Sequence, residues 1–113
     1  AAIGATVFAI AAPTKLEAAY SQCAKAAPDF ATHSALDEDG KGWFLDGKGE
    51  ESPGLGMPDL ACAIQNVAVP DSVVSRMQTT TALMGQQEAT FDGITVRWSY
   101  HPSNGLDMSF EIE

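Results

Sequence analysis

The C-terminal stretch TFDGITVRWSYHPSNGLDMSFEIE contains side chains whose types are suited to a ligand site. Four of them stand close together: Arg97, Trp98, Tyr100 and His101. An arginine binds carboxylates or phosphates, an aromatic ring stacks on a ligand, and a histidine exchanges protons near neutral pH. These four residues form one site only if the element that carries them turns all four to the same face.

Alternation of apolar and polar residues separates the cluster. Asp92-Gly93 lies between two alternating runs, which predicts a two-residue β-hairpin. Counting outward from the turn places Glu88 opposite Arg97 on the polar face, as a structural ion pair. Trp98 and Tyr100 then belong to the apolar face and are expected in the core.

A third strand follows the turn from His101 to Gly105. Its apolar residues recur at every second position and face inward: Leu106, Met108, Phe110 and Ile112. The C-terminal third is therefore predicted to be a three-stranded meander. The turn remains the candidate binding region, and the candidate binding residues are His101, Ser103 and Asn104.

The acidic segment ALDEDGKGWFLD has a partial calcium-loop pattern. Placing Gly40 at the sixth position of an EF-hand loop puts Asp37 and Asp39 at ligand positions but Ala35 at the first one. The segment is therefore expected to be a charged hairpin turn, with Asp37, Glu38 and Asp39 as weak calcium candidates. His33 and His101 lie far apart in sequence and show no zinc-ligand spacing.

The usual signatures of catalysis do not occur. The chain has no Gly-x-Ser-x-Gly elbow, no phosphate-binding loop and no dinucleotide fingerprint. We therefore expect no cofactor, and the absence of these motifs favours a role other than catalysis while leaving a hydrolytic enzyme as an alternative. The net charge of −9 repels phosphate backbones, which argues against a nucleic acid partner.

Capping and turn residues indicate the order of the other elements. Thr14 and Glu17 have capping-box spacing, and Pro28 ends the helix that they begin. The expected elements are a helix over 15–26, short strands over 32–36 and 42–46, a helix opening at 57–59, a short helix from 71 to about 78, and the meander. This order predicts an α+β fold: an antiparallel sheet, formed by the meander and an N-terminal hairpin, covered on one face by about three helices.

The two cysteines are predicted to form a disulfide. Cys23 falls on the apolar face of the first helix, whereas Cys62 lies roughly 200° around its helix from Leu60, away from the apolar stripe. A bond between Cys23 and Cys62 explains that position and points to an oxidising, extracytoplasmic compartment. Two buried free thiols are the alternative.

The first 12 residues carry no charge and are expected to lie outside the folded domain, which spans 13–113. They are too short to span a bilayer alone. They fit the end of a membrane anchor or, with Ala9-Ile10-Ala11, the end of a signal peptide. The alternative is a short apolar element that packs on the domain.

Several short motifs together resemble those of a family of uncharacterised actinobacterial proteins. They are LDGKG at 45–49, DLAC at 59–62, VPDSV at 69–73 and WSYHPSNGL at 98–106. The resemblance implies two cysteines and a hydrophobic membrane segment upstream of residue 13, and it implies no activity or catalytic residue. Trp43 and Phe44 depart from the pattern, because smaller residues stand there in the family.

These features predict an extracytoplasmic binding or interaction domain of a secreted or membrane-anchored protein. Its expected partner is a protein or another component of the cell envelope. The alternatives are a hydrolytic enzyme of the envelope and a structural spacer. A cleft that joins His33 or His101 to buried carboxylates would favour the enzyme, and an exposed apolar patch would favour the binding domain.

Overall fold

A computed structural model describes residues 12–26 and 29–113. The prediction for residues 1–12 therefore falls almost wholly outside the described residues. The elements are, in order, α1 (Lys15–Ala26), η2 (Phe30–Thr32), β1 (Ser34–Leu36), β2 (Gly42–Asp46), α2 (Met57–Val67), α3 (Asp71–Thr79), η3 (Ala82–Met84), β3 (Gln87–Phe91), β4 (Ile94–His101) and β5 (Gly105–Ile112).

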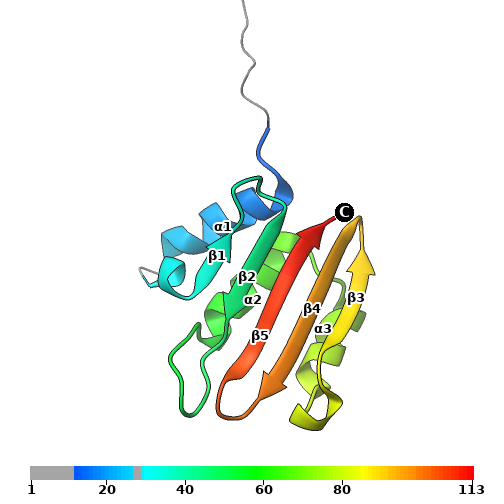
Figure 1. The fold of residues 1–113 in the computed structure, drawn as a ribbon. Helices are drawn as coiled ribbons and strands as arrows, with labels where there is room; N and C mark the ends of the chain where they lie inside the picture. The colour runs from blue at the N-terminus through cyan, green and yellow to red at the C-terminus, as the bar shows by residue number, and fades with distance from the viewer. Residues whose placement is uncertain (1–11, 27–28) are drawn as a thin grey trace, which may run out of the picture.

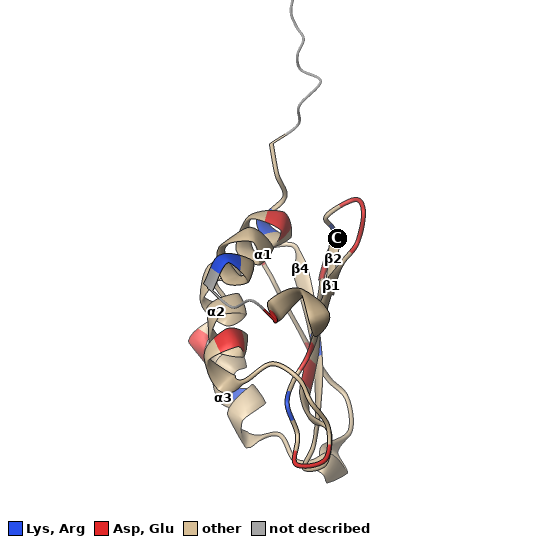
Figure 2. Ribbon diagram, turned by 90° about the vertical axis from the view of Figure 1, so that its left-hand side faces the viewer, with Lys and Arg blue, Asp and Glu red and all other residues tan. Residues whose placement is uncertain are grey.

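The five strands form one sheet in the order β1-β2-β5-β4-β3, and every neighbouring pair is antiparallel. The three α-helices lie on one face of this sheet, as Figures 1 and 2 show. The predicted α+β architecture is confirmed, including the pairing of the N-terminal hairpin with the meander. The predicted first strand begins too early, because residues 30–32 form a 3₁₀ turn that buries Phe30.

The core lies between the helices and the sheet. Its largest fully buried side chains are Leu16, Cys23, Phe30, Trp43, Leu45, Leu60, Val67, Val96, Trp98, Met108 and Phe110. They come from both layers, so the helices and the strands bury one another's apolar faces. The other face of the sheet carries mostly polar side chains and is open, as expected for an antiparallel sheet with one covered face.

The register of the meander is the one that the Asp92-Gly93 turn predicts. Glu88 pairs with Arg97 across β3 and β4, and Trp98 pairs with Met108 across β4 and β5. Asp92 and Gly93 both have positive φ angles, 48° and 74°. A two-residue turn of this kind matches the twist of the strands and so determines which side chains reach the core.

The start of α1 joins the helix to the sheet. The Thr14 amide donates to the Glu17 carboxylate at 2.7 Å, and the Glu17 amide donates to the Thr14 hydroxyl at 3.1 Å. This reciprocal capping box satisfies two amides at the helix end. The Thr14 hydroxyl also donates to the Gly40 carbonyl at 2.6 Å. The cap therefore ties α1 to the turn between β1 and β2.

Trp43 and Phe44 occupy opposite faces of β2. Trp43 is buried and contacts the rings of Tyr20, Phe30 and Phe110, with centroids 5.8–6.0 Å apart. Phe44 lies on the open face and is 47% exposed. Trp43 thus adds one aromatic ring to the core, and Phe44 adds one to the surface.

Cys23 and Cys62 form a disulfide with a Cα–Cα distance of 5.9 Å. Cys23 is buried and Cys62 is half-buried, so the bond joins α1 to α2 beside the core. The bond is compatible with an oxidising environment. Within the described ranges, no helix has both the length and the apolar character needed to cross a membrane.

Candidate functional site

Helix α2 carries two apolar stripes, and only one of them faces the core. Leu60, Ala63 and Val67 are buried beneath the helix. The second stripe also follows helical spacing and consists of Met57, Ala61 and Ile64, and Ala68 continues it directly after the helix. Met57 is 67% exposed, so this second stripe is incompletely covered.

The second stripe forms one wall of an open groove of about 820 Å³, which we call the α2–α3 groove. The opposite side is formed by α3 and by the adjoining ends of β4 and β5. The lining residues are Met57, Ala61, Ile64, Gln65, Ala68, Val69, Asp71, Val74, Met77, Gln78, Thr80, Tyr100 and Leu106. Most of them are apolar, which is typical of small-molecule sites, and the volume falls in their range.

The α3 wall is fixed to the sheet at its C-terminal end. The Trp98 indole on β4 donates to the Thr80 hydroxyl at 2.7 Å, and that hydroxyl donates to the Arg76 carbonyl at 2.6 Å. The Arg76 guanidinium also lies over the Trp98 ring, 5.1 Å from its centroid. These contacts hold the wall in one position, as a preformed site requires.

Tyr100 is not a core residue, contrary to the prediction from alternation. It lies on the helix-covered face, opposite Leu106, but it is 38% exposed. The reason is that β4 extends beyond the part of the sheet that the helices cover fully. Tyr100 and Leu106 therefore line the end of the groove instead of closing the core.

The polar groups of the groove are few. Asp71 begins α3, and Gln65 lies near the end of α2, on the other side of the short connection between the helices. Gln78 and Thr80 lie toward the end of α3. Among the described residues that line the groove, Asp71 is the one charged side chain, and none is a lysine, arginine or histidine.

The predicted binding residues His101, Ser103 and Asn104 lie in the turn beside Tyr100, but none of them lines the groove. The Ser103 carbonyl accepts from the Glu51 amide at 3.0 Å, and the Ser103 hydroxyl donates to the Glu51 carboxylate at 2.9 Å. The His101 ring accepts from the Ser103 amide at 3.1 Å. The turn thus binds the loop that precedes α2, and its role in ligand binding stays a prediction.

The weak calcium candidates belong to the hairpin turn between β1 and β2. Asp37 and Asp39 are both exposed, and Asp39 accepts a hydrogen bond from the Lys41 amide at 2.9 Å. Within residues 12–26 and 29–113, no group of three or more His, Cys, Asp and Glu side chains is placed to hold a metal ion. The local hydrogen bonds are those of a charged hairpin turn, which is what the sequence predicts for this segment.

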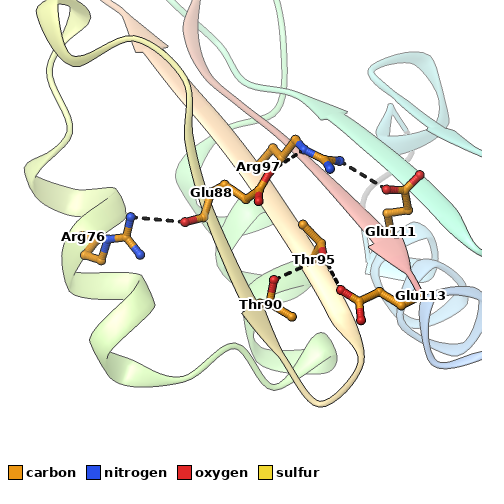
Figure 3. Close-up of polar contacts among 7 residues, drawn as sticks. All are labelled: Arg76, Glu88, Thr90, Thr95, Arg97, Glu111 and Glu113. Carbon is orange, nitrogen blue, oxygen red and sulfur yellow. Dashed lines mark hydrogen bonds and ion pairs between the residues drawn. The ribbon is translucent and has the colours of Figure 1, made fainter.

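The open face of the sheet carries ion pairs between Arg97 and two glutamates, drawn in Figure 3. Arg97 donates to Glu88 at 2.9 Å and to Glu111 at 3.2 Å, so the predicted cross-strand pair is present and extends to β5. Arg76 donates to the backbone carbonyl of Glu88 at 3.2 Å, on the outer strand of the sheet. The groups that accept hydrogen bonds from these two arginines lie on the strands β3 and β5. This arrangement indicates that both arginines have a structural role.

A second polar pair lies on the same face. Asp46 on β2 and Asp107 on β5 are directly opposite in register, and the Gly47 amide donates to Asp107 at 3.1 Å. Burial, followed by a hydrogen bond to Asp46, raises the pKa of Asp107 to about 6. Asp107 borders a small hollow of about 170 Å³ together with Phe44, Arg97 and neighbouring residues.

No known protein family, curated protein or solved structure matches the chain. The structure is that of an α+β protein with an apolar groove between its helical layer and one end of its sheet. The groove is therefore the feature of the molecule that indicates its function.

The groove was not predicted from the sequence, although the sequence contains part of the apolar pattern that forms it. Met57, Ala61, Ile64 and Ala68 recur at helical spacing, on a different face from Leu60 and Val67. A helix with two apolar stripes packs on two partners or leaves one stripe uncovered. The position of α3 decides between these outcomes, and that position depends on tertiary contacts such as Thr80 with Trp98.

Proposed function

We propose that the protein is an extracytoplasmic binding domain whose α2–α3 groove holds a small apolar ligand. The observation that carries this proposal is an open groove of about 820 Å³, lined mainly by apolar side chains, on a fold with a rigidly attached wall. Filling the groove would remove apolar surface from water, which is the main driving force for binding such ligands.

The disulfide supports the location in this proposal, since such bonds persist in oxidising compartments. The domain would be secreted or tethered through the sequence before residue 13, as the resemblance to the actinobacterial proteins implies. Its ligand would then be an apolar component of the cell envelope.

The geometry gives less support to the two alternatives, a hydrolytic enzyme and a structural spacer. The lining of the groove includes neither His33 nor His101, so the groove does not join a histidine to a carboxylate as a hydrolase site would. A spacer would have no use for a groove of this size. The exposed stripe on α2 favours the binding domain over both.

The proposal is tested with the uncharged, polarity-sensitive dye prodan and two matched variants. Ala61→Phe places a ring on the α2 wall, and Ala18→Phe places the same ring on an exposed position of α1 outside the groove. The native domain is expected to bind prodan saturably, with blue-shifted emission. Ala61→Phe should weaken binding at least about tenfold, because it fills the space that the dye needs.

Ala18→Phe should bind the dye as the native protein does. Circular dichroism and thermal melting establish that both variants are folded before titration. Non-saturable binding to the native domain, or equal affinity for the native protein and Ala61→Phe, would refute the proposed function.

A further inference from the structure

We infer that the α2–α3 groove selects an amphiphile with an apolar tail and a cationic head, and that Asp71 sets this preference. The inference rests on the proposed function, because it names the chemistry of the ligand that the same groove would hold. It follows from the arrangement of polar and apolar residues along the groove and from the sign of its charge.

The groove carries a charged side chain, that of Asp71, at one end, whereas the polar lining residues toward the other end, Gln78 and Thr80, are uncharged. Asp71 begins α3, and the helix rises about 12 Å from there to Thr79. The end of α3 is held against β4 by Thr80 and Trp98, and the sheet residues Tyr100 and Leu106 line the groove there. A ligand with a charged head that follows the groove would therefore have that head beside Asp71 and its tail toward the sheet.

The charge of the groove determines which kind of ligand head group binds there. Asp71 is the charged lining residue, and the described lining contains no basic side chain to neutralise an anion. A carboxylate or phosphate head beside Asp71 would meet a like charge, on a chain whose net charge is −9. An ammonium head would instead meet the Asp71 carboxylate, and the amide oxygens of Gln65 and Gln78 are further acceptors along the groove.

Asp71 also has an ordinary structural role, which the test must separate from ligand selection. An acidic residue in the first turn of a helix interacts favourably with the helix dipole. Asp59 occupies the same kind of position in the first turn of α2 and does not line the groove. Asp59→Asn is thus the matched control for Asp71→Asn.

The experiment measures displacement of bound prodan by decylamine, decanol and decanoate at pH 7, each below its critical micelle concentration. These ligands share one tail and differ in the charge of the head. For the native domain we expect decylamine to bind about three- to tenfold more tightly than decanoate, because the attraction of the amine and the repulsion of the carboxylate by one exposed charge add together. Raising the salt concentration should reduce this ratio, because it screens exposed charges.

In Asp71→Asn the ratio should fall to within about twofold, whereas Asp59→Asn should keep the native ratio. A role of Asp71 confined to the helix would change stability in both variants and the ligand ratio in neither. Equal displacement by decylamine and decanoate, or an unchanged ratio in Asp71→Asn, would overturn the inference while leaving the proposed function intact. Failure of prodan and all three ligands to bind would overturn both.

Discussion

The Trp98 indole on β4 and the Thr80 hydroxyl after α3 form a buried hydrogen bond of 2.7 Å. The same hydroxyl donates to the Arg76 carbonyl, so one side chain joins the end of a helix to the centre of the sheet. Both residues are buried, and water does not replace the contact readily. The bond therefore fixes the α3 wall of the groove relative to the strands.

Replacing Thr80 by valine is expected to lower the free energy of unfolding by about 1–3 kcal/mol. Valine keeps the shape of threonine but leaves the buried indole N–H without its acceptor. Urea denaturation measures the change. Thr80→Ser keeps the hydroxyl and should lose less stability than Thr80→Val, and a valine variant as stable as the native protein would show that the bond contributes nothing.

Reduction of the Cys23–Cys62 bond is expected to destabilise the domain. The bond closes a loop with a sequence separation of 39 residues, for which the chain-entropy model gives about 4 kcal/mol. The double variant Cys23→Ala/Cys62→Ala should show a comparable loss in urea denaturation and no further response to reductant. Thiol titration of the unfolded, unreduced native protein should detect no free thiol, and two free thiols would contradict the bond.

The success of sequence reasoning in the meander has a local cause. The positive φ angles at Asp92 and Gly93 suit a two-residue turn, and alternation then determines every later pair in the hairpin, including Glu88 with Arg97. The capping box of α1 is equally local, because its two residues are three positions apart. The sequence alone contains the geometry of such features.

The groove and the loop before α2 depend instead on contacts between distant segments. Leu55 lies in the loop before α2 and is buried, and the loop is held by Ser103 from the turn after β4. Tyr100 fits the apolar alternation, yet its exposure is decided by where α3 ends against β4. Periodicity assigns a residue to a face, but it does not say how far the covering layer extends along that face.

Deletion of residues 1–12 is expected to leave the domain folded. Ala12 and Pro13 are exposed, whereas Thr14 caps α1 and donates a hydrogen bond to the Gly40 carbonyl in the turn between β1 and β2. The melting temperature of the 13–113 variant should therefore remain close to that of the full chain. A fall of more than about 5 °C would correspond to roughly 1 kcal/mol in a domain of this size and would assign these residues to the core.

Asp107 should make the stability of the domain depend on pH. Burial, then the hydrogen bond to Asp46, raises the pKa of Asp107 to about 6 in the folded state, whereas an unfolded aspartate titrates near 3.9. The folded protein thus binds this proton more tightly than the unfolded chain. The resulting stabilisation is full below about pH 4 and is lost as the pH rises through about 6.

Asp107→Asn removes this titration and leaves an oxygen that can accept from the Gly47 amide. The stability of the variant relative to the native protein should therefore increase as the pH rises from 4 to 7, measured by urea denaturation at each pH. Ser99→Ala is the control, because Ser99 faces Asp107 across β4 and β5 and carries no charge. Its effect should be the same at every pH, and a pH-independent effect of Asp107→Asn would show that folding does not change the pKa of Asp107.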